Sequence, residues 1–170
     1  MKAGDIELLK SATDWARAEV FSTSFFVVFG VMFLLGSVSF WYLGKSEIAR
    51  SYVFPTMAAG VLLLIIGLGL IYANVTRISA FETAFNSDAL AFLQSEIARA
   101  ESTLREYQTI VFKAIPAIII VCALGIAFMS TPIWRASFIT AIAMLIVILL
   151  VDGTAHARVD AYHKLLLTVS

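Results

Sequence analysis

The residues best suited to chemistry lie close to the C-terminus of this 170-residue chain. Asp152, His156, Asp160 and His163 recur at intervals of four, four and three residues, so a helix would place them on one face. Carboxylates and imidazoles are common ligands of divalent transition metals. The spacing therefore makes this face a candidate metal site.

A metal site in a helical bundle also needs ligands from neighbouring helices. In a bundle of four helices, Asp14, Glu82 and Glu101 would lie level with Asp160. Di-iron carboxylate bundles use a Glu-x-x-His pair on each of two helices, whereas this chain has a single Asp-x-x-His pair. The speculative ligand set consists of Asp160, His163, His156, Glu101, Glu82 and Asp14. The competing interpretation, which the sequence favours, is a solvated polar helix face with no cofactor.

Hydroxyl side chains in the first apolar segment offer a second kind of site. Ser24 and Ser37 are candidates for lining a pore if several copies assemble around an axis. The competing interpretation is hydrogen bonding to the backbone of their own helix and contact with a neighbouring helix. No ionisable residue lies at the centre of an apolar segment, which argues against proton-coupled transport.

Familiar catalytic motifs are missing from the sequence. It contains no Gly-rich phosphate loop, nucleophile elbow, His-Glu-x-x-His or Cys-x-x-Cys pattern. Cys122 is the single cysteine, so neither an intrachain disulfide nor a multi-thiolate metal site can form. The formal net charge is zero, which gives no electrostatic basis for binding nucleic acid. These observations favour a non-catalytic protein.

Four long uncharged stretches must position all of these residues. Hydrophobic residues make up 61% of the chain and charged residues 14%, against about 25% charged in soluble domains. A membrane-spanning helix needs about 20 apolar residues. Spans are accordingly predicted near 21–43, 52–73, 110–129 and 133–151. We expect an all-α integral membrane protein, because a lipid-exposed segment must satisfy its own backbone hydrogen bonds.

The polar segments continue the apolar ones as helices. Asn86-Ser87-Asp88 is a turn and N-cap signal, Pro132 suits a first helical position, and Pro116 should kink the third helix. A heptad-like stripe runs into the third span and consists of Leu90, Leu93, Ile97, Ala100, Leu104, Tyr107 and Val111. These signals predict that each span is half of a much longer helix.

The predicted fold is a single domain over residues 1–170, built as an up-down bundle of four long antiparallel helices. The helices are predicted near 5–43, 46–85, 87–129 and 132–168. About half of each helix would lie in the bilayer, and the other half would form a cytoplasmic helical extension.

Basic residues indicate the orientation of this bundle. Nine Lys and Arg residues fall on the side that holds both termini and three on the other side, so the termini are predicted to be cytoplasmic. Trp41, Tyr42, Tyr52 and Trp134 cluster at the opposite ends of the spans, as an interfacial aromatic belt would. The predicted location is the inner (plasma) membrane. The expected partners are the lipid bilayer and either further copies of the chain or another membrane protein.

Three functions are consistent with these features. The favoured one is a non-catalytic inner-membrane protein that acts through helix–helix or protein–protein contacts, in a scaffold, accessory or immunity-type role. The second is an oligomeric ion channel or pore, and the third is a metal-binding membrane protein or enzyme. In size and four-span outline the chain is similar to some polytopic bacterial immunity proteins and small accessory membrane subunits, although no motif carries the likeness.

Overall fold

The computed structural model describes the backbone of residues 3–169 and the side chains of residues 7–168. Every element in this part of the chain is helical. The elements are α1 Ala3–Leu43, α2 Glu47–Ser51, α3 Val53–Ser87, α4 Ala89–Glu106, the π-helix η1 Tyr107–Ala114, α5 Ile115–Phe128 and α6 Pro132–Val169. Four helical stretches are long and apolar enough to cross a membrane: Glu7–Leu43, Glu47–Ser87, Ala89–Phe128 and Pro132–Thr168.

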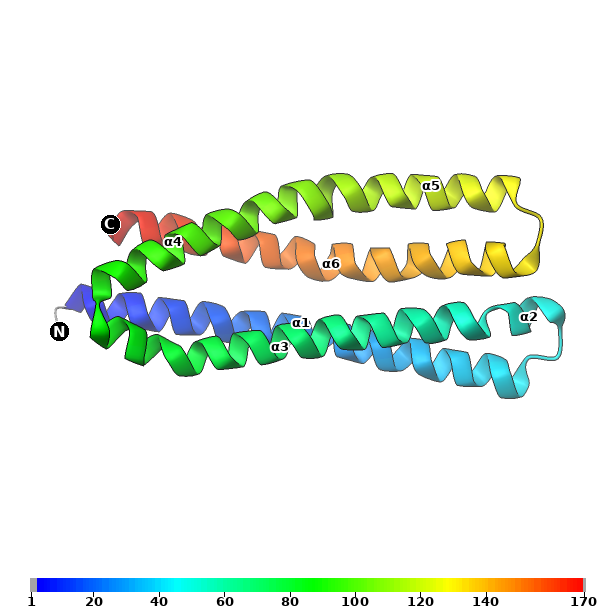
Figure 1. The fold of residues 1–170 in the computed structure, drawn as a ribbon, viewed down its shortest axis with the longest axis horizontal. Helices are drawn as coiled ribbons and strands as arrows, with labels where there is room; N and C mark the ends of the chain where they lie inside the picture. The colour runs from blue at the N-terminus through cyan, green and yellow to red at the C-terminus, as the bar shows by residue number, and fades with distance from the viewer. Residues whose placement is uncertain (1–2, 170) are drawn as a thin grey trace.

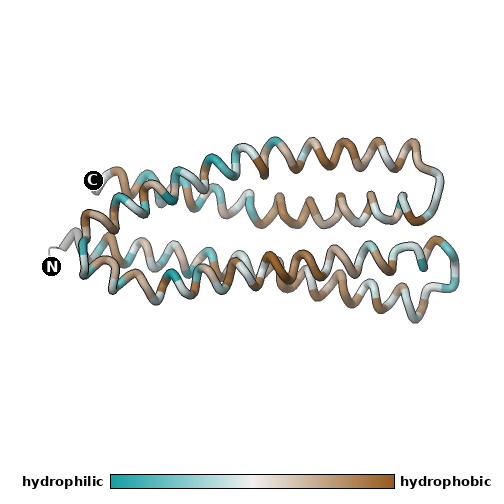
Figure 2. The backbone as a smooth tube through the Cα atoms, in the orientation of Figure 1, coloured by the Kyte–Doolittle hydropathy of each residue, from teal (hydrophilic) through white to brown (hydrophobic). Residues whose placement is uncertain are grey.

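The helices lie side by side as an elongated set of four rods (Figure 1). The first rod is α1, the second is α2 with α3, the third is α4, η1 and α5, and the fourth is α6. The first and third rods run away from the end where both termini lie, and the second and fourth rods run back to it (Figure 1). Hydrophilic residues are frequent in the half of the rods near that end, and hydrophobic residues dominate the other half, apart from a hydrophilic turn at its tip around α2 (Figure 2). We call residues 3–20, 74–109 and 152–169 the polar half, and residues 21–73 and 110–151 the apolar half.

Local signals set the ends of the rods. Asp88 caps α4, because its side chain accepts hydrogen bonds from the backbone amides of Leu90 and Ala91 at 3.0 Å each. Ser46 caps α2 in the same way, through the amide of Ala49. Tyr52 separates α2 from α3, a break that the sequence prediction did not contain. Its physical reason is Pro55, which lacks the N–H that would bond to the carbonyl of the residue four positions earlier.

The third rod changes its winding at η1. The backbone amide of Ile115 donates to the carbonyl of Ile110, five residues earlier, instead of four. Pro116 follows at once and has no amide to continue the regular pattern. The irregularity predicted at Pro116 is therefore a wide π-helical segment on its N-terminal side. Val111 within this segment and Ile115 directly after it are buried, and Tyr107 at its start is half-buried.

Each half has its own core. The polar half is packed around twelve buried residues from all four rods: Leu8, Ala12, Trp15, Ala16, Phe81, Phe85, Phe92, Leu93, Ala100, Val159, Tyr162 and Leu166. The apolar half has a core of four, drawn from α1, α3 and α6: Phe26, Leu63, Val147 and Val151. No residue of α5 belongs to either core.

In the apolar half, α1 and α3 approach closely through glycines. A Cβ atom at Gly60 would lie 2.9 Å from the backbone oxygen of Gly30, and a Cβ atom at Gly67 would lie 2.9 Å from the Cβ of Phe26. Only a residue without a side chain fits at these points, as is common where membrane helices pack. A Cβ atom at Gly69, by contrast, would meet nothing within 4 Å.

Candidate functional site

The six predicted metal ligands do not come together in the structure. Nε2 of His163 on α6 lies 3.6 Å from Oε1 of Glu101 on α4, and this is the one close pair among them. Asp160 instead accepts a hydrogen bond from Nζ of Lys164 at 2.6 Å, and this hydrogen bond lowers the pKa of the Asp160 carboxyl. Among the described residues, no group of three or more His, Cys, Asp or Glu side chains could hold a metal ion.

The reason lies in how α6 is oriented. His156 packs against aromatic ring edges of the third rod, with centroid distances of 5.8 Å to Tyr107 and 5.1 Å to Phe112. Asp14 and Glu82 are exposed on the other rods. Spacing along one helix therefore identified a shared face of α6, but of the three carboxylates predicted from the other rods only Glu101 comes close to it.

The two candidate pore hydroxyls both donate to backbone carbonyls. Ser37 is buried, and its Oγ donates to the carbonyl of Val53 at 2.8 Å, which ties α1 to the start of α3. The Oγ of Ser24 donates within α1 to the carbonyl of Phe21 at 2.5 Å. In the described chain these hydroxyls therefore serve helix structure and helix packing.

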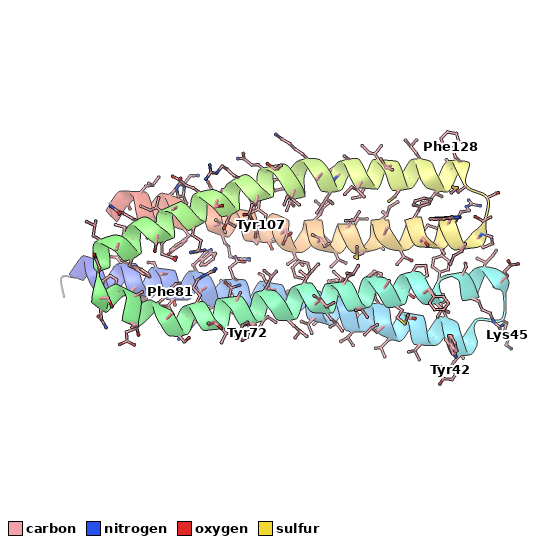
Figure 3. The ribbon with its side chains drawn as sticks, in the orientation of Figure 1. Tyr42, Lys45, Tyr72, Phe81, Tyr107 and Phe128 are labelled. Carbon is pink, nitrogen blue, oxygen red and sulfur yellow. The ribbon has the colours of Figure 1, made fainter. Side chains whose placement is uncertain are left out.

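A charged cavity lies where the two halves meet. Its volume is about 320 Å³, it is partly open, and all four rods contribute to its wall. The polar residues that line it are Trp15, Glu19, Ser22, Thr23, Asn74, Arg77, Arg99, Thr103, Glu106, Tyr107 and Asp152. Tyr107 marks its level, about midway along the third rod (Figure 3). The widened turns of η1 form part of this wall, and π-helical segments often occur at functional sites.

An ion pair joins α1 to α6 beside the cavity. Nη2 and Nε of Arg158 lie 3.1 Å and 3.2 Å from Oε1 of Glu19. The Glu19 side chain is only 7% exposed, and that of Arg158 is 31% exposed. A carboxylate this deeply buried needs a cationic partner, and Arg158 supplies it.

A second network surrounds Glu96, which is buried on α4. Nε of Arg99 donates to Oε1 of Glu96 at 3.0 Å, a second Arg99 nitrogen donates to Oε2, and the hydroxyl of Tyr162 donates to Oε2 at 2.9 Å. Trp15 stacks on Tyr162 with ring centroids 5.2 Å apart, and the Arg99 guanidinium lies 4.3 Å from the Trp15 ring centroid. Burial and the Glu96 carboxylate raise the pKa of Tyr162 above its ordinary value, so this phenol stays a donor.

Three charged residues of the cavity wall, Arg77, Asp152 and Glu106, are left outside these networks. Nη1 of Arg77 donates to Oδ1 of Asn74 at 3.0 Å, but no described carboxylate lies within ion-pair distance of it. Asp152 has neither a hydrogen bond nor an ion pair with any described residue. In addition, the indole Nε1 of Trp15 is buried without a hydrogen-bond partner in the described part of the chain. The exposed carboxylate of Glu106 likewise has no ion pair with a described residue. The cavity therefore offers one cation, two carboxylates and one unused donor.

The sequence prediction did not single out this cavity, although a signal for it was present. Glu19, Arg77 and Asp152 are the charged residues that bound the first, second and fourth uncharged stretches. In four rods of similar length, residues that end the uncharged stretches on one side must lie at one level. Recognising that level would have gathered these three residues without any knowledge of their contacts.

Comparisons with protein-family models, with curated proteins and with solved structures found no match to this chain. The fixed charges of the cavity suit the binding and orientation of a small charged molecule.

Proposed function

We propose that the chain is an integral protein of the inner membrane that crosses the bilayer four times as an antiparallel up-down bundle with cytoplasmic termini. Support comes from four helices of sufficient length and apolarity and from large apolar side chains exposed along the apolar half, such as Phe21, Leu35 and Ile65. A water-soluble protein rarely exposes apolar surface on this scale. The distribution of basic residues supports the orientation.

The end of the molecule far from the termini resembles a membrane interface. Trp41, Tyr42 and Trp134 are exposed there, and Figure 3 places Tyr42 and Lys45 together at this end. Amphipathic aromatic rings with a nearby basic residue suit the headgroup layer. This supports a span that ends close to the loop after α1.

Within the membrane the protein acts, in our proposal, through helix–helix contact rather than catalysis, in a scaffold or accessory role. The observation that carries this proposal is the exposure of α5. Of its fourteen residues only Ile115 and Cys122 are buried, and both lie on the side that faces α6. The flank formed by Ile120, Ala123 and Ala127 is exposed and includes two alanines four residues apart. Small residues at this spacing allow close approach of a second helix.

We propose a second copy of the same chain as the partner at α5. A contact between identical surfaces around a two-fold axis needs a patch that tolerates its own copy. No charged residue lies between Lys113 and Arg135, so two α5 helices can meet without electrostatic repulsion. The α1–α3 pair, by contrast, already uses its small residues internally.

Cysteine cross-linking in native membranes tests this proposal. Ala123→Cys is introduced in a Cys122→Ala background and oxidised with copper phenanthroline, and a disulfide-linked dimer is expected. Leu68→Cys, at an exposed position of α3 in the apolar half, is the matched control and should stay monomeric. Monomer at both positions, or equal dimer at both, would contradict a contact through α5.

A further inference from the structure

The charged cavity holds opposite charges that do not neutralise each other. Arg77 comes from α3 and Asp152 from α6, and both line the same space of about 320 Å³. The Arg77 guanidinium has Arg99, Glu96 and Glu19 as its charged neighbours, whereas Asp152 has only the like charge of Glu19. The Glu19 and Glu96 carboxylates are already engaged by Arg158 and Arg99. Arg77 and Asp152 therefore remain available to a ligand.

Arg77 and Asp152 are the half-buried members of the unpaired charges, whereas Glu106 is exposed, and these two recognise different groups. The guanidinium of Arg77 is a planar donor suited to phosphate or carboxylate, and the buried indole N–H of Trp15 is a further unused donor on the same wall. The carboxylate of Asp152 accepts hydrogen bonds and favours an ammonium group. A volume of about 320 Å³ is at the lower end of the range of about 300–1,000 Å³ for small-molecule sites.

The level of the cavity matches the level of lipid headgroups in the proposed membrane placement. Its wall includes residues from the cytoplasmic ends of all four predicted spans, namely Ser22, Ala73, Ile110 and Val151. The polar headgroup region begins where the hydrocarbon core of about 30 Å ends. A headgroup could reach the cavity from the bilayer without leaving its own layer.

We infer that this cavity binds a zwitterion that carries an anionic phosphate or carboxylate and a primary ammonium group, with the phosphoethanolamine headgroup of a membrane lipid as the best match. The phosphate bonds to Arg77, and the ammonium bonds to Asp152. This inference rests on the membrane placement proposed above. A free zwitterion, such as soluble phosphoethanolamine or glycine, has the same chemistry and is distinguished by the experiment.

Native mass spectrometry of the detergent-solubilised, delipidated full chain tests the inference. Phosphatidylethanolamine, phosphatidylcholine and phosphatidylglycerol of identical acyl chains are added separately, and retained lipid is counted. Phosphatidylcholine cannot donate hydrogen bonds from its quaternary nitrogen, and phosphatidylglycerol has no cation. We expect phosphatidylethanolamine to be retained about tenfold or more tightly than either, the size expected for one lost charge-assisted hydrogen bond.

Two variants test recognition of the two ends of the ligand separately. Asp152→Asn should reduce the retention of phosphatidylethanolamine to that of phosphatidylcholine and leave the other two lipids unchanged. Arg77→Gln should weaken all three, because all three carry phosphate. The matched controls are Asp160→Asn on α6 and Arg105→Gln on α4, both outside the cavity wall. Because the readout is a change in preference among lipids, general loss of stability cannot imitate the Asp152→Asn result.

The source of the zwitterion is tested by adding soluble phosphoethanolamine and glycine both to the lipid-free protein and to protein that has retained phosphatidylethanolamine. If either competes with retained phosphatidylethanolamine at comparable affinity, the cavity takes a free zwitterion, and if neither does, it takes the lipid. Equal retention of the three lipids together with no binding of soluble zwitterions would overturn the inference. So would a lipid preference that both cavity variants leave intact. The cross-linking result at α5 does not depend on these outcomes, so failure of one proposal is separate from failure of the other.

Discussion

The two halves of the molecule are held together in different ways. In the polar half, all four rods contribute side chains to one core of twelve buried residues, and buried networks around Glu19 and Glu96 cross-connect the rods. In the apolar half, the core has four residues, and α5 contributes none of them. The tightly packed part of the apolar half is the α1–α3 pair, where glycines stand in place of bulky side chains. Burial of apolar side chains stabilises a fold that is surrounded by water. Helices surrounded by lipid instead associate through close approach of their backbones.

Two leucines of α6, which runs through both halves, test this difference most directly. Leu166 is fully buried in the polar half, and Leu150 is 64% exposed in the apolar half. Leu166→Ala should lower the free energy of unfolding by about 2–5 kcal/mol, because it leaves a cavity. Leu150→Ala should change it by less than about 0.5 kcal/mol. SDS titration in micelles of fixed composition measures both, and equal losses would show that the halves contribute alike.

The close approach of α1 and α3 gives the next largest expected effect. Gly67→Ala places a methyl group 2.9 Å from the Cβ of Phe26 and should destabilise the protein by about 1–3 kcal/mol through overpacking. Gly69→Ala lies two residues further along α3, where a Cβ meets nothing within 4 Å. Since alanine favours helix, this control should be neutral or more stable by up to about 1 kcal/mol. Thermal unfolding in detergent distinguishes the two, and a loss of similar size at Gly69 would argue against tight α1–α3 packing.

The smallest expected effect concerns the polar network. Tyr162→Phe removes the hydrogen bond to Glu96 and should cost about 1 kcal/mol near neutral pH. Burial and the Glu96 carboxylate raise the pKa of Tyr162 in the folded state, so the phenol stabilises the fold fully below about pH 10, the ordinary pKa of tyrosine. Above that pH the unfolded chain loses the proton first, and the free energy of unfolding falls as the pH rises.

A titration of unfolding free energy from pH 7 to about pH 11 checks this prediction. The fall above about pH 10 should be smaller in Tyr162→Phe than in the unmodified chain. Tyr72→Phe, whose side chain is 74% exposed on α3, is the matched control and should keep the full fall. An unchanged profile in Tyr162→Phe would mean that the buried phenol is not the group that titrates.

Local chemistry in the sequence was enough to predict some of these features. Long uncharged stretches predicted four helices long and apolar enough for a membrane, and the structure contains them. Asp88, one of the three residues of the predicted turn and N-cap signal, caps α4, and Pro132 begins α6. The heptad-like stripe was wrong at Leu90, which is 64% exposed, because the buried side of α4 turns towards Phe92 there.

The remaining features depend on contacts between rods that no single segment encodes. The cavity takes its residues from all four rods, so its charges could be grouped only by comparing the ends of the four uncharged stretches. His156 and His163 share a face of α6, as their spacing predicted, yet one meets aromatic rings and the other meets Glu101. Which neighbour each side chain meets is decided by the rotation of the other rods.

The π-helical segment Tyr107–Ala114 sets how the two ends of the third rod are rotated about their common axis. The segment holds about one residue more than a regular α-helix of the same length would. If the same residues wound as a regular α-helix, all of α5 would turn by about 100° relative to α4, with a shift of about 1.5 Å along the axis. Cys122 would then leave the side that meets α6, and the exposed flank at Ala123 would move with it. The extra residue therefore rotates α5 relative to α4. As a result, one continuous rod presents one face to the polar core and a different face to the apolar half.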